Sequence, residues 1–158
     1  MPRLNNGDTF PILTLDTVSD GAVSVTHQLA GHYGVVLMYR GSWCPFCNAQ
    51  PSAFARAKEK LDGLGIRVVA LSVDSKTDAA TLVEKHRLNF PVGYRADADK
   101  VADLTGAYVN DNPRYLQSTG FVLDPTGKVI TAVYSSGAIG RLVAEDVMGF
   151  VGYVKSRA

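Results

Sequence analysis

Two cysteines, Cys44 and Cys47, are the only ones among the 158 residues, and they lie in the run Trp43-Cys44-Pro45-Phe46-Cys47. They stand between an apolar run typical of a strand and a stretch with helical spacing. With Cys44 as N-cap, Pro45 becomes the first helical residue, where its missing N–H costs nothing. A helix N-terminus stabilises a thiolate, and cysteines in such sites have pKa values of roughly 3.5–7.5 instead of about 8.5. Two sulfurs within one turn can form and reopen a disulfide, so the pair predicts dithiol redox chemistry.

Two other roles for the pair compete with redox chemistry. Free cysteines are often buried structural thiols. A structural zinc site usually takes four ligands from Cys and His, and the three histidines His27, His32 and His86 show no metal-ligand spacing with one another. We therefore expect no metal, and no bound cofactor either, because the two sulfurs carry the electrons themselves.

The elements that must position the pair alternate between strand and helix. Apolar or alternating runs predict strands at residues 10–15, 23–26, 35–39, 66–73, 120–123 and 129–133. Helical spacing and capping residues predict helices at about residues 45–61, 75–88, 100–105 and 141–154. Asp74 or Ser75 is the expected cap of the second of these helices, and Gly106 is expected to end the third. The first two strands form an expected N-terminal hairpin, and the cysteines begin the helix of a βαβ unit. A long polar segment at residues 108–117 is of the kind that often lines a site.

The composition is that of one globular domain spanning residues 1–158. A formal net charge of +1, with 20% charged residues, gives no electrostatic case for binding nucleic acid or an anionic membrane. The polar N-terminus lacks the apolar stretch of a signal peptide, and no run approaches membrane-spanning length. We expect a cytoplasmic location, because a closely spaced cysteine pair in a reducing compartment suits reversible redox chemistry.

Two runs, together with the order of the elements, resemble a known family. A βαβ half followed by a ββα half, with an extra N-terminal hairpin, is similar to the peroxiredoxin-like (alkyl hydroperoxide reductase and thiol-specific antioxidant) branch of the thioredoxin-fold superfamily. The resemblance is to the subgroup with a Cys-x-x-Cys motif, and it implies an α/β thioredoxin-like fold with a central mixed sheet flanked by helices. It also implies a thiol-based oxidoreductase with an antioxidant role. The runs that carry it are Tyr39-Arg40-Gly41-Ser42-Trp43-Cys44-Pro45-Phe46-Cys47 and Gly120-Phe121-Val122-Leu123-Asp124.

The family's active-site pattern matches this chain at one position of four. Peroxiredoxins use a Pro, three residues, a Thr, two residues and the peroxidatic Cys, which the resemblance places at Cys47. Arg40 then stands in the proline position and Cys44 in the threonine position. Ser118 stands where the family has an arginine before a later strand. The proline that faces the disulfide in thioredoxins is also missing near residues 118–120.

Two reaction cycles remain open, and they begin at different sulfurs. In thiol–disulfide exchange, the Cys44 thiolate attacks a disulfide on a partner protein and Cys47 then displaces that partner. In peroxide reduction, Cys47 attacks a hydroperoxide, becomes a sulfenic acid and is resolved by Cys44. Either cycle needs an external thiol reductant of the thioredoxin or glutathione type. We rank exchange slightly first, because the peroxide-binding residues are absent; a redox-sensitive binding module is the non-enzymatic alternative.

Four further residues are candidate supporting groups. Arg40 could lower a thiol pKa or orient a peroxide if its side chain turns toward the pair, and is otherwise a solvated charge. Arg114, in the polar segment, could replace the missing family arginine, although loop arginines are mostly solvated. Trp43 could form a docking surface for a partner or simply pack, and Pro45 starts the helix.

Overall fold

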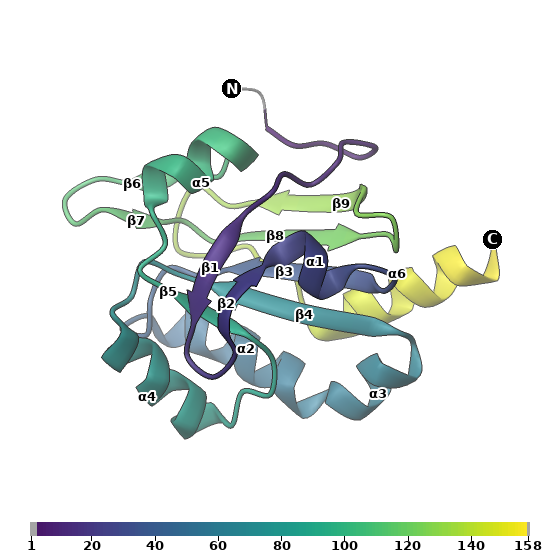
Figure 1. The fold of residues 1–158 in the computed structure, drawn as a ribbon, viewed down its shortest axis with the longest axis horizontal. Helices are drawn as coiled ribbons and strands as arrows, with labels where there is room; N and C mark the ends of the chain where they lie inside the picture. Colours follow the sequence, from purple (N-terminus) through teal and green to yellow (C-terminus); the bar gives the residue numbers. More distant parts are fainter. Residues whose placement is uncertain (1–2, 158) are drawn as a thin grey trace.

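A seven-stranded mixed sheet forms the centre of the computed structural model, which describes residues 3–157 apart from the Phe46 side chain (Figure 1). The strands run in the order β2-β1-β5-β4-β3-β8-β9. β3, β4 and β5 are parallel, and every other pairing in the sheet is antiparallel. Their bounds are β1 Thr14–Thr17, β2 Gly21–Ser24, β3 Tyr33–Met38, β4 Ile66–Leu71, β5 Val92–Tyr94, β8 Thr119–Leu123 and β9 Val129–Tyr134; a separate pair comprises β6 Val109–Asn110 and β7 Tyr115–Leu116.

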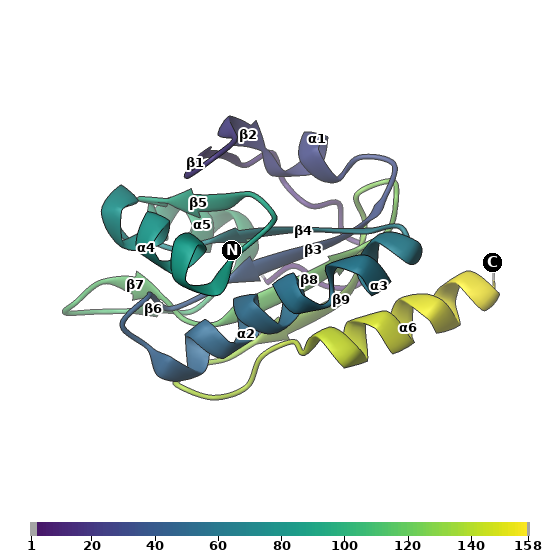
Figure 2. The same ribbon diagram turned by 90° about the horizontal axis from the view of Figure 1, so that it is seen from below.

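Helices cover both faces of the sheet (Figure 2). α2, α3 and α6 lie along one face, whereas α1 lies on the opposite side, next to the sheet strands β1 and β2. Across residues 3–157, no helix is both long and apolar enough to span a membrane. The helices are α1 Val25–Leu29, α2 Pro45–Arg56, α3 Lys58–Gly63, α4 Lys76–His86, α5 Ala98–Thr105 and α6 Ala144–Ser156.

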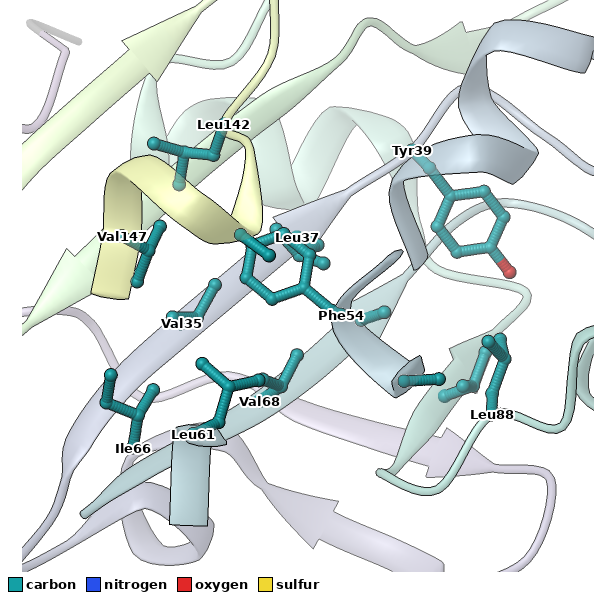
Figure 3. Packing of buried hydrophobic residues seen from close by; sticks show 14 of the residues in the cluster. Val35, Leu37, Tyr39, Phe54, Leu61, Ile66, Val68, Leu88, Leu142 and Val147 are labelled. Carbon is teal, nitrogen blue, oxygen red and sulfur yellow. The ribbon is translucent and has the colours of Figure 1, made fainter. Parts of the chain in front are cut away.

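The sheet divides the core into two clusters, as the side chains of β3 show. Successive side chains of a strand point to opposite faces, so Val35 and Leu37 enter one cluster, and Val36 and Met38 enter the other. The first cluster also contains both cysteines and side chains of α2, α4 and α6, such as Phe54 (Figure 3). The helix that carries the cysteines is therefore fixed to the sheet by the larger part of the core.

Most predicted elements are confirmed, and several differ. The first strand, predicted at residues 10–15, lies at Thr14–Thr17, and β5 Val92–Tyr94 was not predicted. Residues 25–29, partly predicted as strand, form α1, because Val25 and Leu29 lie four apart and are both buried. The predicted helix of residues 45–61 is interrupted at Ala57 and becomes α2 and α3. The polar segment at residues 108–117 contains the short pair β6–β7. The predicted capping of α4 by Ser75 is confirmed, since the Ser75 hydroxyl accepts from the Asp78 N–H at 3.1 Å.

Candidate active site

Several chain segments meet around the cysteines at the end of the sheet where β3 and β4 finish and β8 begins. Met38, near the end of β3, pairs with Leu71 at the end of β4 and with Thr119 at the start of β8. Thr119 in turn pairs with Tyr134 at the end of β9. The start of α2, the β6–β7 pair and the loop into α6 consequently lie at the same end of the molecule (Figure 2). The segments at this end are residues 39–44, 72–74, 117–118 and 135–141.

Cys44 and Cys47 form a disulfide at the N-terminus of α2, with their Cα atoms 5.2 Å apart. Cys44 is the N-cap and Pro45 the first helical residue, as predicted. The Cys47 N–H approaches Cys44 Sγ at 3.3 Å, so the first turn of the helix already directs a donor at that sulfur. The two residues are only 2% and 0% exposed, respectively. Solvent and substrates therefore have little direct access to either sulfur in the disulfide form.

Arg40 turns toward the pair, which was one of its two predicted placements. Its Nη1 lies 3.7 Å from Cys44 Sγ, its Nε donates to Gln117 Oε1 at 3.0 Å, and its Nη2 donates to the Tyr115 hydroxyl at 2.7 Å. The guanidinium lies 5.1 Å from the ring centroids of both Trp43 and Tyr115. Aromatic faces and hydrogen bonds thus hold one cation against Cys44. Tyr115 and Gln117 also place the predicted polar segment against the site.

Arg141 brings a second guanidinium, which the sequence analysis missed. Its Nη2 lies 3.7 Å from Cys47 Sγ. The adjoining Leu142 is held by Gln50 of α2, whose Nε2 donates to the Leu142 carbonyl at 2.8 Å. Leu142 also packs against Gly120, where a Cβ would come within 2.6 Å of the leucine side chain. Contacts with α2 and β8 therefore fix the backbone beside Arg141.

The two sulfurs are each paired with a separate positive charge. Partial burial lowers the pKa of Arg141, and the neighbouring charge of Arg40 lowers it further.

The order of the predicted strands contained a signal for the position of Arg141. The predicted strand at residues 129–133 follows the strand at 120–123 in a hairpin, so the next residues return to the end of the sheet from which 120–123 began.

Arg114 takes the surface position that was the second of its two predicted placements, and among the described residues no contact with either sulfur involves it. Its guanidinium donates to Asp99 and Asp111. The hydrogen bond to Asp99 is the main cause that raises the pKa of Arg114. All three side chains are well exposed. Two nearby carboxylates thus hold this arginine at the surface.

Trp43 shows features of both of its predicted roles. Its ring packs edge-to-face on Tyr115, with the centroids 4.9 Å apart, yet the residue remains 56% exposed. A Cβ at Gly41 would overlap the indole, so glycine leaves the space that the ring occupies. Trp43 directly precedes Cys44 in the chain. Whether a partner uses this surface stays a prediction.

Ser118 is buried, and its Oγ has no hydrogen-bond partner among the described residues. It occupies the position where the resembled family has an arginine. Its carbonyl accepts from the Ser135 N–H at 3.0 Å, which ties the segment leading to Arg141 to the start of β8.

No group of three or more His, Cys, Asp or Glu side chains within residues 3–157 could hold a metal ion.

Comparisons with known proteins agree with this architecture. The profile described as the AhpC/TSA family matches residues 6–132. The chain is 27% identical over 151 residues to a peroxiredoxin of Treponema denticola, covering 93% of this chain and 71% of that one. It is 30% identical over 121 residues to the thiol-disulfide oxidoreductase ResA of Bacillus anthracis, covering 75% and 61% of the two chains. The solved structure of the peroxidoxin BcpB of Mycobacterium tuberculosis has the same fold, with a TM-score of 0.82 at 18% identity over 96% of this chain and 99% of that one.

Proposed function

Because this chain belongs to the AhpC/TSA family and is a thiol-based oxidoreductase, we propose that its oxidising substrate is a hydroperoxide, which Cys47 attacks and Cys44 resolves. The observation that carries this proposal is the Arg141 guanidinium, 3.7 Å from Cys47 Sγ. Exchange ranked first on sequence because the family's proline, threonine and arginine are absent. Arg141 supplies a guanidinium from another part of the chain, and this favours peroxide reduction.

The first step oxidises Cys47. Its thiolate attacks the terminal peroxide oxygen, so that an S–O bond forms, the O–O bond breaks and the departing alkoxide takes up a proton to become an alcohol. Arg141 stabilises the attacking thiolate, and a cation here also offsets the negative charge that develops on the leaving oxygen.

The second step closes the disulfide. The Cys44 thiolate attacks Cys47 Sγ, the S–S bond forms, the S–O bond breaks, and hydroxide leaves and becomes water on protonation. The peroxide has then gained two electrons and the two cysteines have lost them. The disulfide is present with α2 intact from Pro45 and capped by Cys44, so the resolving step requires no unfolding of the helix.

An external thiol reductant of the thioredoxin or glutathione type completes the cycle by returning two electrons, which come from one dithiol or from two glutathione molecules. We propose that it attacks Cys44, because this cysteine adjoins the exposed Trp43 and lies at the outer end of the helix. A reducing compartment such as the cytoplasm would supply such a donor. Fractionation of cells that produce the protein would test that location.

Thiol–disulfide exchange that starts at Cys44 is the second candidate. It is favoured by the Arg40 guanidinium, 3.7 Å from Cys44 Sγ, and by the similarity to ResA, a thiol-disulfide oxidoreductase. Here the Cys44 thiolate attacks the disulfide of a partner protein and Cys47 releases the reduced partner. The two candidates predict opposite effects of the two cysteine substitutions.

The deciding experiment compares Cys44→Ser and Cys47→Ser in a hydroperoxide assay and a protein-disulfide reduction assay. We expect Cys44→Ser to react once with hydroperoxide and leave a sulfenic acid that a dimedone probe traps at Cys47, and Cys47→Ser to consume no peroxide. If instead the parent shows negligible peroxide turnover and Cys47→Ser forms stable mixed disulfides with partner proteins, exchange is the function.

A further inference from the structure

Asp74 is a buried acidic residue that neither reaction cycle uses. It follows β4 and is 8% exposed, and no lysine or arginine of residues 3–157 forms an ion pair with its carboxylate. Burial raises the pKa of Asp74, the Ser42 N–H partly opposes that rise, and the nearby charge of Asp78 adds to it. An unpaired carboxylate in such a place is costly to bury, and perturbed groups of this kind gather at functional sites.

The Asp74 carboxylate binds the segment that leads into Cys44. The Ser42 N–H donates to Asp74 Oδ2 at 2.8 Å, and the Ser42 carbonyl accepts from Asn48 Nδ2 at 3.0 Å. The Cys44 N–H donates to the Gly41 carbonyl at 3.2 Å, which closes a tight turn around Ser42. Side chains on both sides therefore hold the backbone two residues before Cys44.

Asp74 is itself firmly placed. Its N–H donates to Ser72 Oγ at 3.2 Å, and its carbonyl accepts from the Arg95 N–H at 2.7 Å. Because β3 and β4 are parallel neighbours, the residues after β4 lie beside the loop that follows β3. The Asp74 carboxylate thus holds the segment before Cys44 in a fixed position relative to the sheet.

We propose that Asp74 is a positioning residue for the Cys44–Cys47 pair: its carboxylate fixes Ser42 and thereby holds Cys44 Sγ within reach of Cys47. The inference rests on the redox role of the pair that underlies the proposed function, and not on the identity of the oxidant. A shift of about 1 Å in a reacting atom can cost up to about 100-fold in rate. The step that depends on Asp74 is disulfide closure, in which one sulfur must meet the other.

The charge of Asp74 makes this positioning dependent on pH. Hydrogen bonds to an ionised acceptor are roughly twice as strong as neutral ones, so protonation of Asp74 weakens its hold on Ser42. The ionisable groups that face the carboxylate are Asp78 on α4 and the hydroxyl of Tyr39 after β3. Neither is a cation, so neither holds Asp74 ionised as the pH falls.

Two substitutions separate the charge from the acceptor atom. Asp74→Asn keeps an oxygen that can accept from Ser42 but removes the charge, and we expect closure to slow about fivefold at neutral pH. Asp74→Ala removes the acceptor, and we expect at least about tenfold slowing. Asp78→Asn is the matched control, because it makes the same change on an exposed residue of α4 that does not contact Ser42. Circular dichroism checks that each variant is folded.

The experiment mixes reduced protein with oxidised glutathione, which needs no peroxide chemistry. One protein thiolate first attacks a sulfur of oxidised glutathione in a bimolecular step, which breaks the glutathione S–S bond, forms a mixed disulfide and releases one glutathione thiolate. The other cysteine then attacks the mixed disulfide in a first-order step, which closes the Cys44–Cys47 disulfide and releases the second glutathione. Trp43, the only tryptophan, reports closure by its fluorescence. The ratio of wild-type to Asp74→Asn closure rates should be about five at neutral pH and fall toward one as acid protonates Asp74. The Asp78→Asn protein should close at the wild-type rate.

Unchanged closure in both Asp74 variants would overturn the inference, and so would a ratio that does not change with pH. Either result would leave peroxide reduction untouched. Conversely, a protein that consumes no hydroperoxide but shows the expected closure rates would refute the proposed function and support the role of Asp74.

Discussion

Replacement of Arg141 tests whether this residue activates Cys47. The guanidinium lies 3.7 Å from the sulfur. At that distance two unit charges attract by about 1 kcal/mol in water and about 4.5 kcal/mol at an effective dielectric constant of about 20. Arg141 is partly exposed, so solvent screening places the value toward the lower end. We take about 1.4 kcal/mol, which corresponds to about tenfold in the equilibrium between thiol and thiolate.

The assay isolates Cys47 in a Cys44→Ser background. We expect Arg141→Ala to move the pH profile of iodoacetamide alkylation to higher pH, with about tenfold slower alkylation on its acid side. The second-order reaction with hydrogen peroxide, followed by Trp43 fluorescence, should slow as well. Arg141→Lys should lie between, since it keeps a charge but loses the planar fork of donors.

Arg114→Ala is the control for this experiment. It removes the same charge, but from an arginine that pairs with Asp99 and Asp111 at the surface. Its alkylation profile should match that of the parent. The reasoning fails if Arg141→Ala alkylates with an unchanged profile while circular dichroism shows an unchanged fold, because the proximity of guanidinium and sulfur would then have no effect on the thiolate.

Two further predictions concern Arg40 and Asp124. In a Cys47→Ser background, Arg40→Ala should slow alkylation of Cys44 about tenfold on the acid side of the pH profile. The reason is that the guanidinium 3.7 Å from Cys44 Sγ is lost. In the Cys44→Ser background, the same substitution should leave the alkylation rate of Cys47 almost unchanged. Burial opposes ionisation of Asp124, but hydrogen bonds from Thr126 and Lys128 outweigh it and lower the pKa of Asp124. Asp124→Ala should therefore reduce the free energy of unfolding by about 1 kcal/mol at neutral pH, after allowance for solvent screening. In urea titrations this difference should be complete above the ordinary pKa of aspartate and shrink as acid protonates the wild-type residue through its lowered pKa; a difference independent of pH would contradict it.

The local features of the site were predictable from neighbouring residues. A proline directly after Cys44 favours the first position of a helix, and the helix begins there. The strands of the βαβ unit are largely apolar runs, and both are buried on both faces except at the exposed Arg67 of β4. Gly106 ends α5 in the left-handed conformation, as its position after residues 100–105 predicted.

The features that local patterns could not give are contacts between distant segments. Arg141 meets Cys47 across 94 positions, and nothing in its immediate surroundings distinguishes it from a surface arginine. The surface position of Arg114 also depends on a distant residue, because its guanidinium donates to the carboxylate of Asp99, 15 positions away. Asp74 was foreseen as a possible helix cap, but Ser75 caps α4 instead. The carboxylate is thereby free to bind Ser42.

The two arginines also bear on how readily the disulfide accepts electrons. In the oxidised protein, Arg40 and Arg141 stand beside neutral sulfur atoms and close enough for one to disturb the ionisation of the other. Reduction replaces the neutral disulfide by thiolates that compensate these cations. Any group that stabilises the reduced form raises the reduction potential, as in strongly oxidising dithiol proteins. The Cys44–Cys47 disulfide should thus have a raised reduction potential. Added salt screens the arginines and should lower that potential.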